Sequence, residues 1–222
     1  IVVDAGNIGA AAIHWLPARR DGRFLVALGM GGMGYSFGAG IGMAFARGRR
    51  AVVIAGDGSF FYMHGMEIHT AVHYRLPVTF VLFDNHAHAM CVTREQVFFG
   101  DRYSYNRFGP PSRLGAGGLS AMFPGLPSVD VTDVGELDVA IKAALDVDGP
   151  SVVSVECSAD EIPPFTALFW IQGEADDTAR ARGHHRTPRW RRPDSGTDAH
   201  RDVAAGEGDS GPHGDDSRGL SA

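Results

Sequence analysis

Short, unbroken apolar runs alternate with amphipathic stretches along residues 1–165. The apolar runs are rich in valine and other β-branched side chains, which is typical of strands buried on both faces of a sheet. We expect such strands at residues 1–3, 24–27, 51–55, 78–83 and 151–155.

The stretches between these runs have the residue spacing of helices. Helices are expected near residues 33–46, 62–74, 86–96 and 134–147. Alternating strands and helices indicate an α/β fold with a doubly wound, mostly parallel sheet and right-handed crossovers. In such a sheet, ligands bind at the carboxyl ends of the strands.

Two regions depart from this alternation. Residues 97–128 are rich in glycine, proline, arginine and aromatic side chains, and we interpret so long a connection as an active-site flap. Residues 171–222 are dominated by small, polar and charged side chains that cannot bury a core. We therefore expect one domain over residues 1–165 and a disordered tail over residues 171–222. Out-of-frame translation of GC-rich DNA is an alternative origin for the tail.

The overall composition narrows the class of protein. The 222 residues carry a formal net charge of −6, which argues against a nucleic-acid partner because no basic stripe is present. No apolar run approaches the ~20 residues of a membrane-spanning helix. The two cysteines are too few for a disulfide framework, so we expect a cytoplasmic protein.

The residues that carry chemistry follow two of the expected strands. Gly56-Asp57-Gly58 ends the strand at 51–55, and its glycines allow close approach of the backbone to a ligand. The helix that follows can offer amides to a phosphate, and Asp57 beside a phosphate requires a bridging cation such as Mg²⁺. Asn85, 28 residues after Asp57, emerges at the end of the next strand and can complete an oxygen ligand set.

This pair of motifs resembles the C-terminal diphosphate-binding domain of thiamine diphosphate (ThDP) enzymes, in which Gly-Asp-Gly is followed by Asn after some 25–30 residues. The chain is most similar to acetolactate (acetohydroxyacid) synthases and related 2-oxoacid decarboxylases, because residues 29–35 match their Gly-x-Gly-x-Met-Gly-Tyr segment. The resemblance implies ThDP and Mg²⁺ as cofactors. It implies Asp57, Asn85 and the backbone carbonyl of Ala87 as metal ligands.

The same resemblance assigns further roles in holding the cofactor. Met33 would lie between the two rings of ThDP and impose its bent shape, and the Gly31 carbonyl would accept the 4′-amino group. The cofactor-binding residues implied in this way are Gly6, Asn7, Gly31, Met33, Gly56, Asp57, Gly58, Ser59 and Asn85.

The chain also departs from the synthases. Asp84 stands where they usually have a first asparagine, and Arg94 stands where they carry a tryptophan that shapes substrate choice. An arginine at this position could pair with a second anionic group of a substrate. Two histidines, His86 and His88, follow Asn85 closely. We predict His88 and Arg94 as catalytic residues, His88 for proton transfer or substrate binding.

The resemblance implies decarboxylation of a 2-oxo acid, with possible carboligation to a second carbonyl compound. The glutamate that activates ThDP belongs to a separate pyrimidine-binding domain in this family. We therefore expect a half-site that a further domain or subunit completes in a homo- or hetero-oligomer.

Three alternatives remain open at this point. One is a subunit of a two-chain sulfopyruvate- or phosphonopyruvate-type decarboxylase, and another is a non-catalytic regulatory subunit. The third is a NAD-binding dehydrogenase, because Gly29, Gly31 and Gly34 also match a dinucleotide fingerprint. A separate histidine pair, His69 and His73, shares one helical face without an evident third metal ligand.

Overall fold

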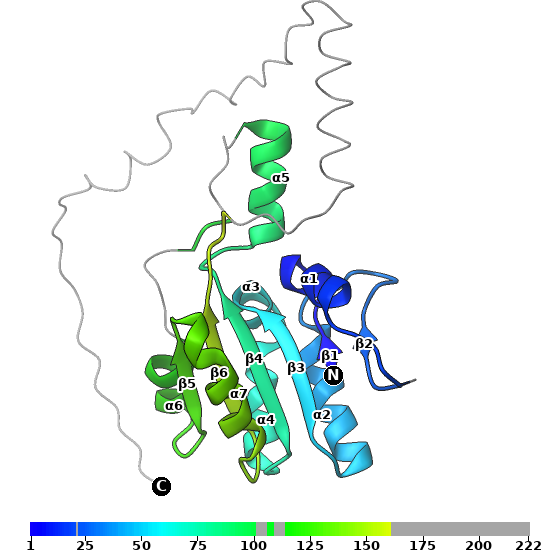
Figure 1. Ribbon diagram of the computed structural model, residues 1–222, viewed down its shortest axis with the longest axis vertical. Coiled ribbons are helices and arrows are strands. Elements are labelled where there is room, and N and C mark those ends of the chain that lie inside the picture. Colours follow the sequence, from blue (N-terminus) through cyan, green and yellow to red (C-terminus); the bar gives the residue numbers. More distant parts are fainter. Residues whose placement is uncertain (21, 101–105, 109–113, 161–222) are drawn as a thin grey trace, which may run out of the picture. The chain divides into compact units, whose positions relative to one another are not determined.

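A six-stranded, entirely parallel sheet forms the centre of the fold (Figure 1). The computed structural model describes residues 1–20, 22–100, 106–108 and 114–160. The sheet order is β2-β1-β3-β4-β6-β5. The strands are β1 (Val2–Val3), β2 (Leu25–Val26), β3 (Ala51–Gly56), β4 (Val78–Asp84), β5 (Ser128–Val131) and β6 (Ser151–Glu156).

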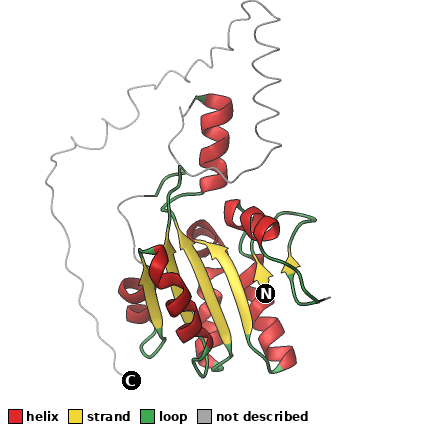
Figure 2. Ribbon diagram, viewed as in Figure 1, coloured by secondary structure: helices red, strands yellow, loops and turns green. Residues whose placement is uncertain are grey.

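Helices lie on both faces of this sheet, and one further helix, Ala89–Phe99, extends beyond the carboxyl ends of the strands (Figure 2). They are α1 (Asn7–Trp15), α2 (Tyr35–Arg47), α3 (Asp57–Ser59), α4 (Ile68–His73), α5 (Ala89–Phe99), α6 (Ser120–Met122) and α7 (Leu137–Leu145). Short π or 3-10 turns lie at Phe60–His64, Gly65–Glu67, Gly115–Leu119 and Val134–Glu136. Parallel strands covered by helices on both faces confirm the predicted α/β class.

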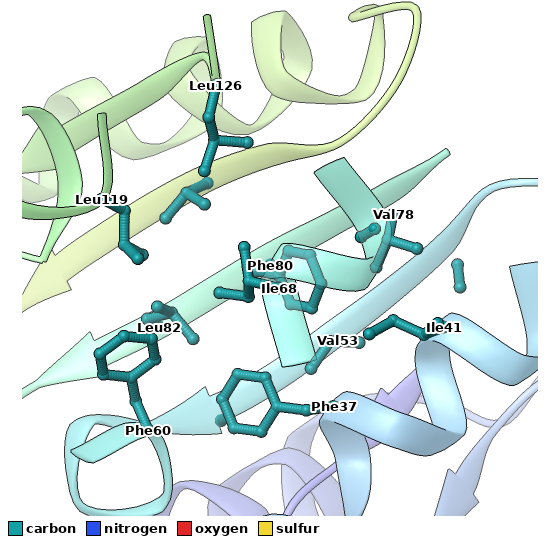
Figure 3. Packing of buried hydrophobic residues seen from close by; sticks show 14 of the residues in the cluster. Phe37, Ile41, Val53, Phe60, Ile68, Val78, Phe80, Leu82, Leu119 and Leu126 are labelled. Carbon is teal, nitrogen blue, oxygen red and sulfur yellow. The ribbon is translucent and has the colours of Figure 1, made fainter. Parts of the chain in front are cut away.

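The larger core lies between the sheet and the helices α2 and α4 (Figure 3). Phe37 of α2 stacks on Phe80 of β4, with ring centroids 6.0 Å apart, and Ile68 of α4 is fully buried beside them. A smaller core joins α7 to Val81 and Val153 on the opposite face. Successive residues of β4 thus point into different cores, which explains why its sequence is apolar without a break.

The expected elements agree with the structure where the apolar pattern is strong. All five predicted strands are present, and the predicted helix at 134–147 appears as a 3-10 turn that leads into α7. The predicted helix at 62–74 is wrong in its first half, because Met63 (φ −125°, ψ −110°) interrupts it and only Ile68–His73 is α-helical.

The apolar pattern did not predict α1, the short helix α6 or the strand β5. The helix α1 follows β1 directly, and its glycine- and alanine-rich sequence has only a weak apolar stripe. The edge strand β5, with two valines in four residues, begins at Ser128, the last residue of the segment interpreted as a flap. Residues 101–105 and 109–113 of that segment lie outside the described residues, as does the predicted tail over 171–222. In the described ranges, every helix is too short or too polar to cross a membrane.

Candidate cofactor site

A cleft opens at the carboxyl ends of β1, β3 and β4, the sheet edge at which the sequence predicts a ligand. The chain turns sharply after β1 and after β3. The helices α1, α3 and α5 all begin at this edge of the sheet (Figure 1). Ten predicted site residues line the cleft: Gly6, Asn7, Met33, Gly56, Asp57, Gly58, Ser59, Asn85, Ala87 and His88. Gly31 and Arg94 do not line it.

The side chains of two predicted metal ligands, Asp57 and Asn85, both accept a hydrogen bond from the backbone amide of the third, Ala87. The Ala87 N–H donates to Asn85 Oδ1 at 3.1 Å and to Asp57 Oδ2 at 3.3 Å. The other carboxylate oxygen of Asp57 accepts the Gly58 N–H at 2.9 Å. Side-chain oxygens from the ends of β3 and β4 therefore converge, as Mg²⁺ coordination by carboxylate and amide oxygens requires.

Glycine is necessary at position 58 because His88 lies against it. A Cβ added to Gly58 would lie 2.5 Å from His88 Nδ1, closer than any real contact of this kind. The second glycine of Gly-Asp-Gly thus lets the loop after β4 approach the turn after β3.

Two buried carboxylates, Asp57 and Asp84, lie beside each other at this end of the cleft. Burial, and then the charge of Asp84 and a side-chain hydrogen bond with it, raise the pKa of Asp57 to about 7. Burial also raises the pKa of Asp84, whereas the neighbouring His86 opposes this rise. A divalent cation would stabilise both ionised carboxylates, so this donor set fits a metal ion.

His88 presents an uncharged imidazole to the cleft. Burial lowers its pKa below the usual value. Its ring packs against Tyr62 and Phe108, with centroids 4.7 and 5.2 Å away, and its buried Nδ1 has no hydrogen-bond partner among the described residues. A buried ring nitrogen without a partner can accept or donate a proton when a ligand enters.

The two predicted residues outside the cleft are both exposed. Gly31 has a φ of +64° and belongs to the loop before α2, on the same loop as Met33. Arg94 lies on α5, where its Nη1 donates to the Met90 carbonyl at 3.2 Å. This bond holds the guanidinium along its own helix.

Asp4 is a buried residue of the site region that the sequence reasoning missed. Its Oδ1 accepts the Gly34 N–H at 2.9 Å, and its Oδ2 accepts the Ser36 hydroxyl at 2.6 Å. Asp4 thereby ties the end of β1 to the start of α2 and fixes the loop that carries Met33. The only sequence signal was a carboxylate directly after an apolar strand.

Residues 106–108, within the segment interpreted from the sequence as an active-site flap, run alongside the loop after β4. The His88 N–H donates to the Asn106 carbonyl at 2.8 Å, and the Phe108 N–H donates to the His86 carbonyl at 2.7 Å. The Asn106 side chain also donates to Glu95 Oε1 of α5 at 2.7 Å. We call residues 106–108 the clamp segment, because its bonds bracket Ala87 on both sides.

These features define a class of protein. Residues 4–155 match the family described as thiamine pyrophosphate enzyme, C-terminal TPP binding domain. The chain belongs to this family, which implies ThDP with Mg²⁺ as its cofactor. Family membership decides against the dinucleotide-binding alternative, whose glycine pattern left Asn85 unexplained.

Within this class the chain is similar to acetolactate synthases. It is 32% identical over 165 residues to the acetolactate synthase isozyme 2 large subunit of Escherichia coli (strain K12), covering 73% of this chain and 29% of that protein. It is 32% identical over 160 residues to acetolactate synthase 3, chloroplastic, of Brassica napus, covering 68% and 24%. The crystal structure of benzoylformate decarboxylase from Polynucleobacter necessarius superposes with a TM-score of 0.63 at 25% identity, covering 74% and 30%. The chain spans less than a third of each of these proteins.

Proposed function

We propose that this chain supplies the metal- and diphosphate-binding half of an active site that decarboxylates a 2-oxo acid, with carboligation as in acetolactate synthases. The observation that carries the proposal is the convergence of Asp57 and Asn85 on the Ala87 amide, inside a cleft that Met33 also lines. The similarity to acetolactate synthases supports the choice of reaction.

In this proposal, Asp57, Asn85 and the Ala87 carbonyl hold Mg²⁺. Gly6 and Asn7 stand at the start of α1, whose first amides have no partner within the helix and suit a diphosphate oxygen. Met33, held in place through Asp4, supports the bent cofactor. When bound, ThDP would supply a nucleophilic carbon and an electron sink for the decarboxylation of a 2-oxo acid.

The chain's own residues would then control protons and water around the reacting centre. The uncharged His88 can exchange a proton at Nδ1, since this atom faces no competing partner in the described part of the chain. The aromatic side chains of Tyr62 and Phe108 exclude water from one side of this ring. Arg94 lies exposed on α5 and donates to the Met90 carbonyl, so it does not place a cation in the cleft in this arrangement.

The activating glutamate would come from a pyrimidine-binding domain or subunit. Calorimetric titration of the full 222-residue chain with ThDP and Mg²⁺ tests whether the chain is a half-site that binds the cofactor without turning over substrate. Saturable binding that needs both ligands is expected, with no release of CO₂ from pyruvate by this chain alone. Absence of binding would refute the cofactor role, and turnover of pyruvate would refute the half-site.

A further inference from the structure

Three metal-ligating side chains meet beside the cleft. Asp57, Asp84 and His86 each bring one ligand atom to a place where all three atoms lie within 4.8 Å of one another. The two carboxylates are almost completely enclosed, since Asp57 is 1% and Asp84 is 3% exposed. Buried carboxylates of this kind are normally paired or bound to a metal.

The contact between Asp84 and His86 does not have the geometry of a hydrogen bond. Asp84 Oδ1 lies 3.0 Å from His86 Nδ1, yet this buried oxygen has no hydrogen-bond partner within the described ranges. Two ligands at neighbouring positions of an octahedral ion, each bonded at about 2.1 Å, stand about 3.0 Å apart. The spacing of the two atoms therefore suits one edge of a coordination shell.

Asp84 also changes the charge of the site. A site of Asp57, Asn85 and a backbone carbonyl has one negative charge. It depends on the diphosphate for the further negative charge that balances a divalent cation. With Asp84 ionised as well, the protein itself supplies two negative charges to a divalent cation. An imidazole nitrogen beside two carboxylates favours first-row transition metals over Mg²⁺, which prefers oxygen ligands.

We propose that Asp57, Asp84 and His86 form a cation site that binds a divalent transition metal such as Mn²⁺ in the absence of diphosphate. This inference rests on the proposed function only in that Asp57 is shared with the metal site proposed there. Loading of the metal then precedes ThDP, and the cation is held by protein ligands until diphosphate oxygens become available.

The experiment uses the full chain and Mn²⁺ alone, without ThDP. Electron paramagnetic resonance counts bound Mn²⁺, and pulsed measurements detect the coupling of a directly bonded ¹⁴N nucleus. We expect one site with a nitrogen ligand, and binding at least about tenfold tighter than that of Mg²⁺ alone measured by competition.

Two variants, of which Asp84→Asn is isosteric, assign the ligands. His86→Asn suits the left-handed backbone at this position (φ +57°) and should remove the ¹⁴N coupling. Asp84→Asn should weaken Mn²⁺ binding by about tenfold or more, because it removes one of the two ligand charges. The matched control His69→Gln/His73→Gln removes an exposed histidine pair on α4 and should change neither result.

The outcomes separate the two proposals. Mn²⁺ that binds only with ThDP, a ¹⁴N coupling that survives in His86→Asn, or Mg²⁺ binding as tight as Mn²⁺ binding would each overturn the cation site. None of these results affects the proposed function, which fails if ThDP with Mg²⁺ does not bind or if this chain alone releases CO₂ from pyruvate.

Discussion

The candidate site has two ends, a metal end at Asp57 and Asn85 and a Met33 end at the loop before α2. The chain encloses the metal end more completely than the Met33 end. At the metal end, Asp57 and Asp84 are buried and Asn85 is half-buried, and the side chains of Asp57 and Asn85 both accept the Ala87 N–H. At the Met33 end, the loop before α2 is open to solvent, and its neighbours Leu28 and Met30 are 71% and 89% exposed. Large apolar side chains with such exposure are costly unless another surface covers them.

This contrast has a physical consequence for the proposed function. The metal end can bind its ligands with the contacts that one chain provides, because parallel strands place their carboxyl ends together. The Met33 end provides one side of a pocket and needs a second surface opposite. When the chain is studied alone, we therefore expect substitutions at the metal end to reduce the affinity for ThDP with Mg²⁺ more than substitutions at the Met33 end do.

The largest effect is expected from Asp57→Asn. Loss of an outer partner of a metal ligand already costs 10–100-fold in affinity, so loss of the ligand charge itself should reduce affinity for ThDP with Mg²⁺ by about 100-fold or more. Calorimetric titration measures this change. Asp138→Asn, an exposed carboxylate on α7 paired with Lys142, is the control and should bind like the parent chain.

A dependence on pH should follow from the same residue. Because the pKa of Asp57 is raised to about 7, a proton competes with the metal, so Mg²⁺ affinity should fall by about tenfold per pH unit below 7 and level off above it. The raised pKa also means that the folded, metal-free protein binds this proton more tightly than the unfolded chain does. Its stability should therefore decrease as the pH rises from about 4 to 7.

Thermal melting in a chelator, compared at several pH values, checks the second part of this prediction. In Asp57→Asn, which cannot ionise, the decrease between pH 4 and 7 should become shallower. If the melting temperature of the variant decreased with pH as steeply as that of the parent chain, groups other than Asp57 would cause the decrease in stability.

Met33→Ala tests the open end of the site. In this chain alone, ThDP affinity should fall by less than about tenfold, because the side chain has no opposing surface to press the cofactor against. A loss equal to that of Asp57→Asn would contradict the contrast between the two ends. Met122→Ala, which truncates an exposed methionine on α6, serves as the control.

The smallest effect on metal affinity is expected at the clamp segment. Asn106→Ala removes the hydrogen bond to Glu95 Oε1, so that neither oxygen of this buried carboxylate has a partner among the described residues, at a cost of about 1–3 kcal/mol. Metal affinity should fall only about two- to fivefold, since Ala87 is affected indirectly. Hydrogen exchange should become faster at the His88 amide, which donates to the Asn106 carbonyl. Gln96→Ala, whose side chain reaches Asp160 on the surface, should leave this amide protected.

The strands and the Gly-Asp-Gly turn could be predicted because their signals are local. A strand buried on both faces is apolar without a break, and residues at the ends of β3 and β4 must share one sheet edge. By contrast, β5 and α1 have short or weak patterns, and the sequence reasoning placed neither. The break at Met63 was also missed, because neither its backbone angles nor the close contact of Gly65 with Phe60 follows from an apolar pattern.

The sequence by itself determined the α/β fold, the edge of the sheet that holds the ligand, and the family to which the chain belongs. Only the tertiary structure decided which polar residues meet there. Asp4 reaches a loop 30 residues away, Asn106 meets Glu95 across 11 residues, and Asp57 and Asp84 become buried neighbours. Such contacts depend on how strands and loops pack in three dimensions, and no local pattern of residues records that packing.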